Sequence, residues 1–242
     1  DEWDWSFGDG GTSTAQHPVY TYTQVGVYTV TQQVTDTASG AWDVLTRPHY
    51  ISVTDVSIAG LNATNDSPTS WGNPTHLTAT VTAGSNVTYA WALGDGDSSS
   101  GAVVSHTYPE AGVYTAVVTA SNSVNLITAT TTVTITPVAG FTATPRQGIA
   151  PLVVQFTDTS SSGVDQWLWR FGDGGNSVVR HPVYTYTQSG VFTVTQTVTE
   201  ITSGGRDTLT RTHYITVSGT GGSELVTRVI TYTYDGLYRL GG

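Results

Sequence analysis

The sequence predicts an all-β protein built from consecutive two-layer antiparallel sandwiches. Three observations lead to this fold class: apolar and polar residues alternate along short segments, no helical period interrupts them, and one order of segments returns along the chain. Glycine, proline, asparagine and aspartate separate the alternating segments, as turns between strands require. Several such strands in about 80 residues describe a tandem array of immunoglobulin-like antiparallel β-sandwiches.

The repeat is clearest between residues 1–53 and 165–217, which align without gaps and share 35 identical residues. A more diverged copy lies between these two segments. Each copy carries a turn aspartate, at Asp9, Asp95 or Asp173, with a tyrosine thirteen residues later and a glycine seventeen residues later. This constant spacing predicts one backbone plan for three units.

Alternation places the strands within each unit. After the glycine of the first unit, Tyr28, Val30 and Val34 share one predicted face and threonines occupy the other. The third unit repeats this pattern over residues 192–199 and has another alternating segment at residues 152–157. A period of two along these segments indicates strands that bury one face.

Two residue types on the apolar face predict what the cores contain. Trp5, Trp91 and Trp169 each lie four residues before a turn aspartate, where sandwiches of this class place a core tryptophan, so we expect all three between two sheets. Gln32 and Gln196 fall on the same apolar face. A buried glutamine needs hydrogen-bond partners, which the sequence does not identify.

The repeat divides the chain into four predicted parts. Residues 54–136 form a diverged sandwich and residues 137–217 a complete one. Residues 1–53 begin at the position equivalent to Asp165, so we expect a sandwich that lacks its first two strands. Residues 218–242 are a glycine-rich linker followed by a β-strand tail. A chain that starts without methionine or a signal peptide is expected to be a piece of a longer polypeptide.

Composition excludes several classes of function. The net charge is −10 and all eight basic residues are arginine, which argues against a nucleic-acid partner because such proteins cluster lysine and arginine. The absence of cysteine and lysine excludes thiol catalysis, zinc thiolate sites and lysine-based crosslinks. No stretch approaches the roughly 18 to 20 apolar residues of a membrane span. Abundant threonine, serine, glycine and tyrosine favour an extracellular or cell-surface location.

Three motifs in order carry a family resemblance. Trp-x-Phe-Gly-Asp-Gly, His-Pro-Val-Tyr-Thr-Tyr and Gly-Val-Tyr-Thr-Val-Thr closely resemble the polycystic-kidney-disease (PKD) domain. The middle copy departs from the pattern with Leu93 in place of phenylalanine and without the proline. The resemblance implies a non-catalytic extracellular module of a bacterial or archaeal surface protein. The segment 229–240 of the tail is similar to a tyrosine-aspartate repeat of the rearrangement-hotspot family, which hints at a large parent polypeptide.

The Phe-Gly-Asp-Gly segment is interpreted as a hairpin turn. No helix and no lysine follow it, as a phosphate-binding loop would require. We therefore expect Asp9 and Asp173 to accept local backbone hydrogen bonds and not to act as catalytic acids. His17 and His49 recur as His181 and His213 in the duplicated segment, which favours a scaffold role. No catalytic motif stands out, so the sequence predicts no enzyme and no required cofactor.

Two kinds of local site are candidates in the middle unit. Asp95 and Asp97 have the carboxylate spacing of a hard-cation site, so calcium is possible, although two carboxylates alone do not complete a calcium shell. Asn62, Asn65 and Asn86 begin Asn-x-Ser/Thr sequons and are candidate glycosylation sites. A solvated turn and chance occurrence in a threonine-rich chain are the alternatives.

Trp42 and Trp71 lie outside the repeat pattern in segments predicted as loops, and are candidates for stacking on a ligand. They support one of three open functions, a carbohydrate- or protein-binding adhesion module that meets a surface glycan or protein. The leading alternative is a rod-like structural spacer or filament subunit. A hydrolase accessory fragment is a third.

The filament hypothesis rests on the first unit and on the tail. Ile230, Tyr232 and Tyr234 alternate, so we expect them to present one apolar face that could complete the first unit of a neighbouring subunit. Such head-to-tail self-association does not close and yields a filament. The alternative is that the missing strands belong to the same polypeptide and precede the sequence given.

Overall fold

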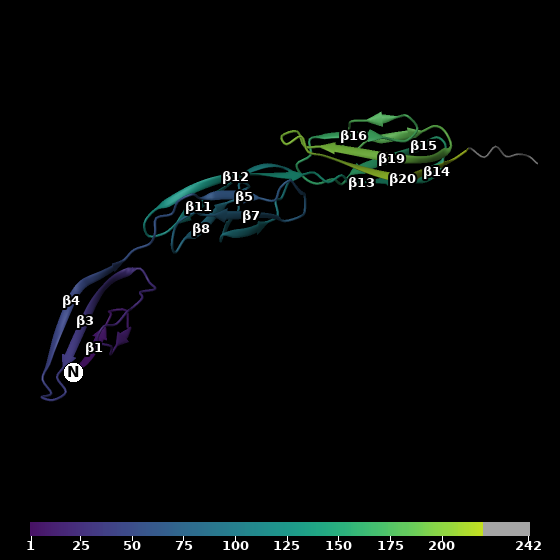
Figure 1. Ribbon diagram of the computed structural model, residues 1–242. Helices are drawn as coiled ribbons and strands as arrows, with labels where there is room; N and C mark the ends of the chain where they lie inside the picture. Colours follow the sequence, from purple (N-terminus) through teal and green to yellow (C-terminus); the bar gives the residue numbers. More distant parts are fainter. Residues whose placement is uncertain (220–242) are drawn as a thin grey trace, which may run out of the picture. The chain divides into compact units, whose positions relative to one another are not determined.

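The computed structural model describes residues 1–219, and Figure 1 shows that they form strands joined by turns and loops. The strands are numbered β1 to β20 in chain order and include no helix among the described residues. The predicted all-β, immunoglobulin-like fold class is confirmed. Within residues 1–219 there is accordingly no helix long and apolar enough to cross a membrane.

Residues 1–53 form a single four-stranded sheet. The spatial order is β2-β1-β3-β4. The strands are β1 (Glu2–Ser6), β2 (Thr12–Ser13), β3 (Gly26–Thr35) and β4 (Trp42–Val53). All pairs are antiparallel, and a bulge interrupts β3 and β4 between Tyr28 and Val30.

The middle unit pairs a three-stranded sheet, β10-β7-β5, with a five-stranded sheet, β6-β12-β11-β8-β9. The strands are β5 (Asn62–Asn65), β6 (Thr69–Ser70), β7 (Thr75–Thr80), β8 (Thr88–Ala92), β9 (Ser98–Ser100), β10 (Val103–His106), β11 (Gly112–Ser121) and β12 (Leu126–Thr136). Alternate residues of both sheets point inward, so Leu77, Trp91 and Val118 meet in one core.

The third unit repeats this arrangement with sheets β13-β15-β18 and β14-β20-β19-β16-β17. The strands are β13 (Phe141–Thr144), β14 (Gln147–Ile149), β15 (Leu152–Asp158), β16 (Gln166–Arg170), β17 (Asn176–Ser177), β18 (Val183–Tyr186), β19 (Gly190–Thr199) and β20 (Arg206–Ser218). Its core contains Phe156, Trp169 and Val194, all fully buried.

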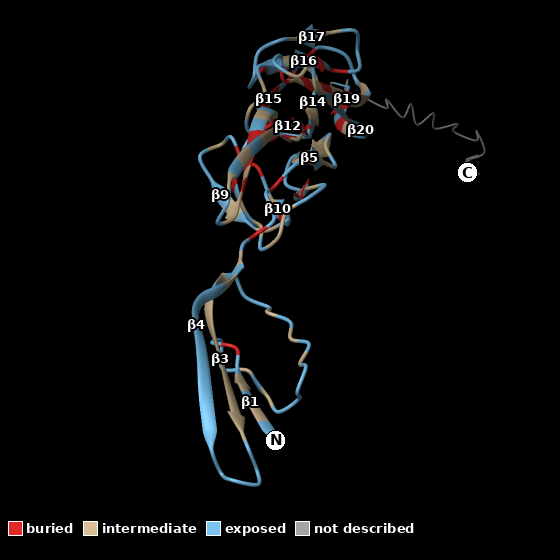
Figure 2. Ribbon diagram, turned by 60° about the vertical axis from the view of Figure 1, so that its left-hand side comes forward, coloured by how far each residue is buried: buried red, intermediate tan, exposed pale blue. Residues whose placement is uncertain are grey.

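By its internal contacts the described chain separates into two compact parts, the first of which includes both the first and the middle repeat. One contains residues 1–138 with the short segments 161–164 and 200–206, and the other contains residues 139–160, 165–199 and those from 207 onward. Figure 2 shows red, buried residues inside the sandwiches, whereas β1, β3 and β4 are drawn almost entirely in the colours of intermediate and exposed residues.

The core tryptophan prediction is confirmed for two units and wrong for the first. Trp91 and Trp169 are 2% and 0% exposed. Trp5 is only partly buried, because no second sheet covers β1 within residues 1–219. Burial of a sheet residue requires a layer on its face as well as an apolar side chain.

Candidate functional site: the open face of the first sheet

One face of the first sheet carries residue types that are usually buried in a sandwich core, but no second sheet covers this face within residues 1–219. The register pairs Trp5 with Gln32 and Gln32 with Leu45, so these three side chains share a face. We define the open face as Trp3, Trp5, Val30, Gln32, Val34 and Leu45. None of these six residues is buried, and Leu45 is 52% exposed.

The third unit contains the same six residue types at the equivalent positions, namely Trp167, Trp169, Val194, Gln196, Val198 and Leu209. Four of them, Trp169, Val194, Gln196 and Val198, are 0% exposed. The difference is therefore not one of sequence. It follows from the three-stranded sheet that covers the face in the third unit.

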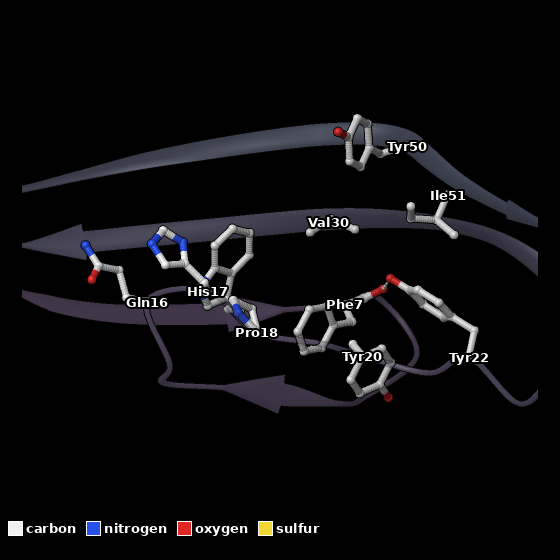
Figure 3. Close-up of a pocket in the computed structure, with 10 residues that line it drawn as sticks. Phe7, Gln16, His17, Pro18, Tyr20, Tyr22, Val30, Tyr50 and Ile51 are labelled. Carbon is white, nitrogen blue, oxygen red and sulfur yellow. Dashed lines mark hydrogen bonds between the residues drawn. The ribbon is translucent and has the colours of Figure 1, made fainter.

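A groove of about 420 Å³ opens beside the open face. Figure 3 shows the ring of Phe7 beside that of Tyr20, with Val30 and Tyr50 above them in this view. The Phe7 and Tyr20 rings stack with centroids 3.9 Å apart, which is the geometry of the Phe171 and Tyr184 pair in the third unit. Stacked aromatic rings therefore form part of the groove wall.

The segment that would form the edge of a second layer is also in place. Residues 183–186 form β18 in the third unit and pair with β15, whereas the equivalent residues 19–22 are in no strand. Side chains still hold this segment, because the Tyr22 hydroxyl donates to the Phe7 carbonyl at 2.9 Å and the Tyr20 hydroxyl to Asp9 Oδ2 at 2.8 Å. Its backbone edge is available to an added strand.

The turn aspartates have the predicted role. Asp9 and Asp173 each accept a hydrogen bond at 3.0 Å from the backbone amide two residues later. This bond, together with that from Tyr20, lowers the pKa of Asp9 despite the opposing effect of desolvation. Each carboxylate therefore stabilises its own turn.

A buried polar cluster in the third unit was not predicted from the sequence. Asp158, at the end of β15, accepts hydrogen bonds from Gln196 Nε2 at 2.7 Å and Arg180 Nε at 3.1 Å. Burial acts to raise the pKa of Asp158, but bonds from Ser160, Arg180 and Gln196 outweigh it and keep the pKa low. The backbone amide of Asp158 donates to His181 Nδ1. The expected partner of buried Gln196 is thus a carboxylate 38 residues away.

Comparison with known proteins agrees with the repeated sandwich. A family model described as PKD domain matches residues 1–53 and 135–217, and a second model with the same description matches residues 60–135. The chain belongs to the PKD domain family. The predicted family is therefore confirmed, while the organism and the resemblance of the tail stay predictions.

Among solved structures, the chain is similar to individual PKD domains from two Vibrio species. The PKD1 domain of the Vibrio cholerae metalloprotease PrtV is 36% identical over 35% of this chain and 99% of that one, with a TM-score of 0.30. The PKD1 domain of Vibrio anguillarum Epp is 31% identical over 34% and 96%, with a TM-score of 0.29. The ectodomain of mouse nectin-like molecule 4 is 11% identical over 91% and 90%, with a TM-score of 0.34.

In the middle PKD unit a histidine lies beside the two aspartates of the turn, and the sequence did not point to it. His106, the last residue of β10, lies with Nε2 2.6 Å from Asp95 Oδ2 and 4.0 Å from Asp97 Oδ2. His106 occupies the position of Tyr20 and Tyr184, which bond the turn aspartate in the other units. The three ligand atoms lie within 4.8 Å of one another. Calcium prefers oxygen, so this pairing favours a structural turn, and calcium at Asp95 and Asp97 stays a prediction.

The three sequons differ in the availability of their side-chain nitrogens. Asn65 Nδ2 donates to Thr131 Oγ1 and to the Thr132 carbonyl. Asn86 Nδ2 donates to Asp55 Oδ1 at 2.7 Å. Asn62 is exposed on the edge strand β5. Glycosylation at all three stays a prediction, and geometry favours Asn62.

The two candidate stacking tryptophans also differ. Trp42 is 67% exposed and begins β4, where it pairs with Thr35 of β3, so its predicted place in a loop is wrong. Trp71 lies in a turn, is 37% exposed and donates its indole N–H to the Pro109 carbonyl at 2.9 Å. The assembly candidates Ile230, Tyr232 and Tyr234 lie outside the described residues.

Proposed function

We propose that this chain is a non-enzymatic extracellular structural protein, a spacer of PKD units whose first unit takes up β-strands from another polypeptide. The single observation that supports this most directly is the open face, where six core-type residues stand on a sheet that no second layer covers within residues 1–219. Their counterparts lie in a closed sandwich in the third unit.

Strand addition would satisfy two needs of the first unit at once. It would cover apolar surface that single-domain proteins rarely leave exposed. It would also pair the backbone of residues 19–22, which form no strand here but pair as β18 in the third unit. Main-chain hydrogen bonds supply the affinity of such complexes, and pockets for alternate side chains supply the specificity.

A donor on a second copy of the chain makes the contact heterologous. Head-to-tail contacts of this kind repeat without closing and generate a filament. Within this chain the candidate donor is the segment 218–242, because it begins with a glycine-rich linker and then alternates at Ile230, Tyr232 and Tyr234. The extracellular setting is supported by composition and by the family.

Hydrogen exchange measured by mass spectrometry, together with mass measurement over a range of concentrations, tests this function. Residues 1–53 should exchange rapidly in dilute monomer and become protected as the protein assembles. A chain that lacks residues 224–242 identifies the donor, because loss of assembly in this variant assigns it to the tail. Residues 1–53 that are already protected in a dilute monomer, or a protein that stays monomeric at every concentration, would contradict strand addition.

The 67% exposure of Trp42 favours a second candidate function, a carbohydrate- or protein-binding adhesion module. A glycan array tests it. Binding that is lost in Trp42→Ala and retained in Trp71→Ala, where the native indole is already hydrogen-bonded, would support this function. No reproducible binding by the unmodified chain would exclude glycans as its ligands.

A further inference from the structure

We propose that the third unit forms an internal ester bond between the side chains of Ser160 and Gln196, with Asp158 transferring the proton. The serine oxygen displaces the side-chain nitrogen of the glutamine as ammonia. Ser160 follows β15 and Gln196 lies in β19, so the bond joins the two sheets of the sandwich. This modification acts once on its own chain and does not depend on the strand addition proposed above.

The three reacting groups are already in contact in the folded chain. Ser160 Oγ donates to Asp158 Oδ1 at 2.5 Å and lies 3.4 Å from Gln196 Oε1. Gln196 Nε2 donates to the same carboxylate oxygen at 2.7 Å. One oxygen of Asp158 therefore contacts both the hydroxyl that attacks and the nitrogen that leaves. Groups held at such distances react as one molecule and need no encounter in solution.

The reaction balances without an oxidant, a reductant or a further reactant. Asp158 takes the hydroxyl proton while Ser160 Oγ forms a bond to Cδ of Gln196, and the electron pair of the carbonyl moves to Oε1. The carbonyl then forms again, the bond from Cδ to Nε2 breaks, and Asp158 returns the proton to the leaving nitrogen. The products are the ester, ammonia and an unchanged carboxylate.

Two neighbours of the cluster favour the attack. The Gly140 amide donates to Ser160 Oγ at 3.1 Å, which stabilises this oxygen as its proton leaves. Arg180 Nε donates to Asp158 Oδ2 at 3.1 Å, so the other carboxylate oxygen faces the reacting groups. Burial acts to raise the pKa of Asp158, but bonds from Ser160, Arg180 and Gln196 keep it low, and the carboxylate is ionised at neutral pH. A base of low pKa reacts slowly, yet one turnover for each molecule is enough.

Burial protects the carboxamide and the ester from water. Gln196 is 0% exposed and Asp158 is 5% exposed. Exclusion of water from a reactive site suppresses hydrolysis as a side reaction. The ammonia that leaves is diluted into solvent, so the reverse reaction is negligible and the ester accumulates.

The middle unit shows that a sandwich of this kind closes without the polar cluster. Val118 pairs with Trp91 as Gln196 pairs with Trp169, so a valine stands where the third unit has glutamine. Val118 is also 0% exposed. A buried carboxamide costs free energy that valine avoids, so the cluster has a role other than filling the core. The chain has neither cysteine nor lysine, and an ester is a covalent link that needs neither.

Mass spectrometry of the full chain tests the ester directly. The folded chain should be lighter than its sequence mass by about 17 Da, the mass of the ammonia lost. Trypsin cleaves after arginine, so Ser160 falls in the peptide 147–170 and Gln196 in the peptide 181–206. These two peptides should be recovered as one linked species. Hydroxylamine, which cleaves esters, should separate them.

Variants of the cluster separate the reaction from the fold. Ser160→Ala and Asp158→Asn should have the full mass and give no linked peptides, because one lacks the nucleophile and the other the base. Ser161→Ala is the matched control and should keep the link, since Ser161 is also buried but its Oγ accepts the Val138 amide. The linked chain should melt at a higher temperature than Ser160→Ala, because the bond closes a loop between the two sheets.

A folded, unmodified chain that keeps its full sequence mass after days at neutral pH would overturn the inference, whatever the variants do. A gain of about 1 Da at Gln196 would also overturn it, because water and not Ser160 would then attack the carboxamide. A linked pair of peptides in Ser160→Ala would assign the bond to another residue and reject the role of Ser160.

Discussion

One tyrosine in each unit connects the hairpin turn to the opposite segment of chain. The hydroxyls of Tyr22, Tyr108 and Tyr186 donate to the backbone carbonyl two residues before the turn aspartate, at 2.9, 3.0 and 3.0 Å. Desolvation raises the pKa of Tyr108 to about 12 and that of Tyr186 further, so both remain protonated donors. The same bond in the first unit shows that this connection forms without a closed core.

Trp5 and Trp169 test what burial contributes at one repeated position. Trp169→Ala should lower the free energy of unfolding of the third unit by about 3–5 kcal/mol, because it leaves a cavity in a closed core. Trp5→Ala should cost clearly less, since Trp5 is partly exposed although its indole N–H makes the equivalent bond to a backbone carbonyl. Differential scanning calorimetry of the full chain measures both, and equal costs would contradict the assigned difference in burial.

Asp55 should make the middle unit sensitive to acid. Hydrogen bonds from Ser123, Ser85 and Asn86 lower its pKa from 3.8 to about 2. A folded-state pKa below the unfolded one means that the carboxylate stabilises the fold above about pH 4, and that this stabilisation is lost as pH falls toward 2. The melting temperature from pH 5 to pH 2 should therefore fall more steeply in the unmodified chain than in Asp55→Asn, and parallel curves would reject this role.

At the scale of the element, the hairpin turn depends on glycine in every unit. Gly8, Gly94 and Gly172 have φ of 82°, 94° and 94°, a region that other residues rarely adopt. An added Cβ would also lie 2.5, 2.6 and 2.4 Å from a backbone carbonyl oxygen of the following long strand. Conformation and close approach therefore both require glycine before the turn aspartate.

Gly172→Ala should destabilise the third unit by more than about 1 kcal/mol, because the native φ is strained for alanine and the Cβ meets the Thr193 carbonyl oxygen. Gly174→Ala is the matched control, since a Cβ there meets nothing within 4 Å although φ is 101°. Urea unfolding of both variants separates the close contact from the backbone strain. Equal destabilisation would show that the contact with Thr193 contributes little.

At the scale of the whole molecule, two segments with 35 identical residues have different environments. The open face and its counterpart share all six residue types, yet only the counterpart is covered by the β13-β15-β18 sheet. Local stability follows burial of apolar contacts and protection of backbone hydrogen bonds. Equivalent strands of the two units should therefore differ in the free energy of local opening, and those of the first unit should open more readily.

Native-state hydrogen exchange in dilute monomer should show this asymmetry. Amides of β3 should exchange at least about tenfold faster than the equivalent amides of β19, because their sheet lacks a second layer. Near-identical sequences over these strands make the two segments internal controls for intrinsic exchange. Equal protection of β3 and β19 would mean that the first sheet is stable by itself, which would weaken the case for strand addition.

The sequence by itself determined the features that depend on neighbours along the chain. Alternation identified the strands, the internal repeat identified the units, and the Gly-Asp-Gly pattern identified the turns in which Asp9 and Asp173 accept backbone bonds. These features are local, so periodicity and turn chemistry are enough to predict them. The requirement for a partner of buried Gln196 was also predicted, but not the partner.

Only the tertiary structure decided which side chains meet and which faces are covered. Asp158 bonds Gln196, which is 38 residues away in the sequence, and His106 contacts Asp95, which is 11 residues away. No local pattern encodes these two contacts. Trp5 and Trp169 occupy the same position in near-identical segments, yet one is partly exposed and the other is fully buried. Burial is a property of two packed layers, so the sequence of one layer cannot determine it.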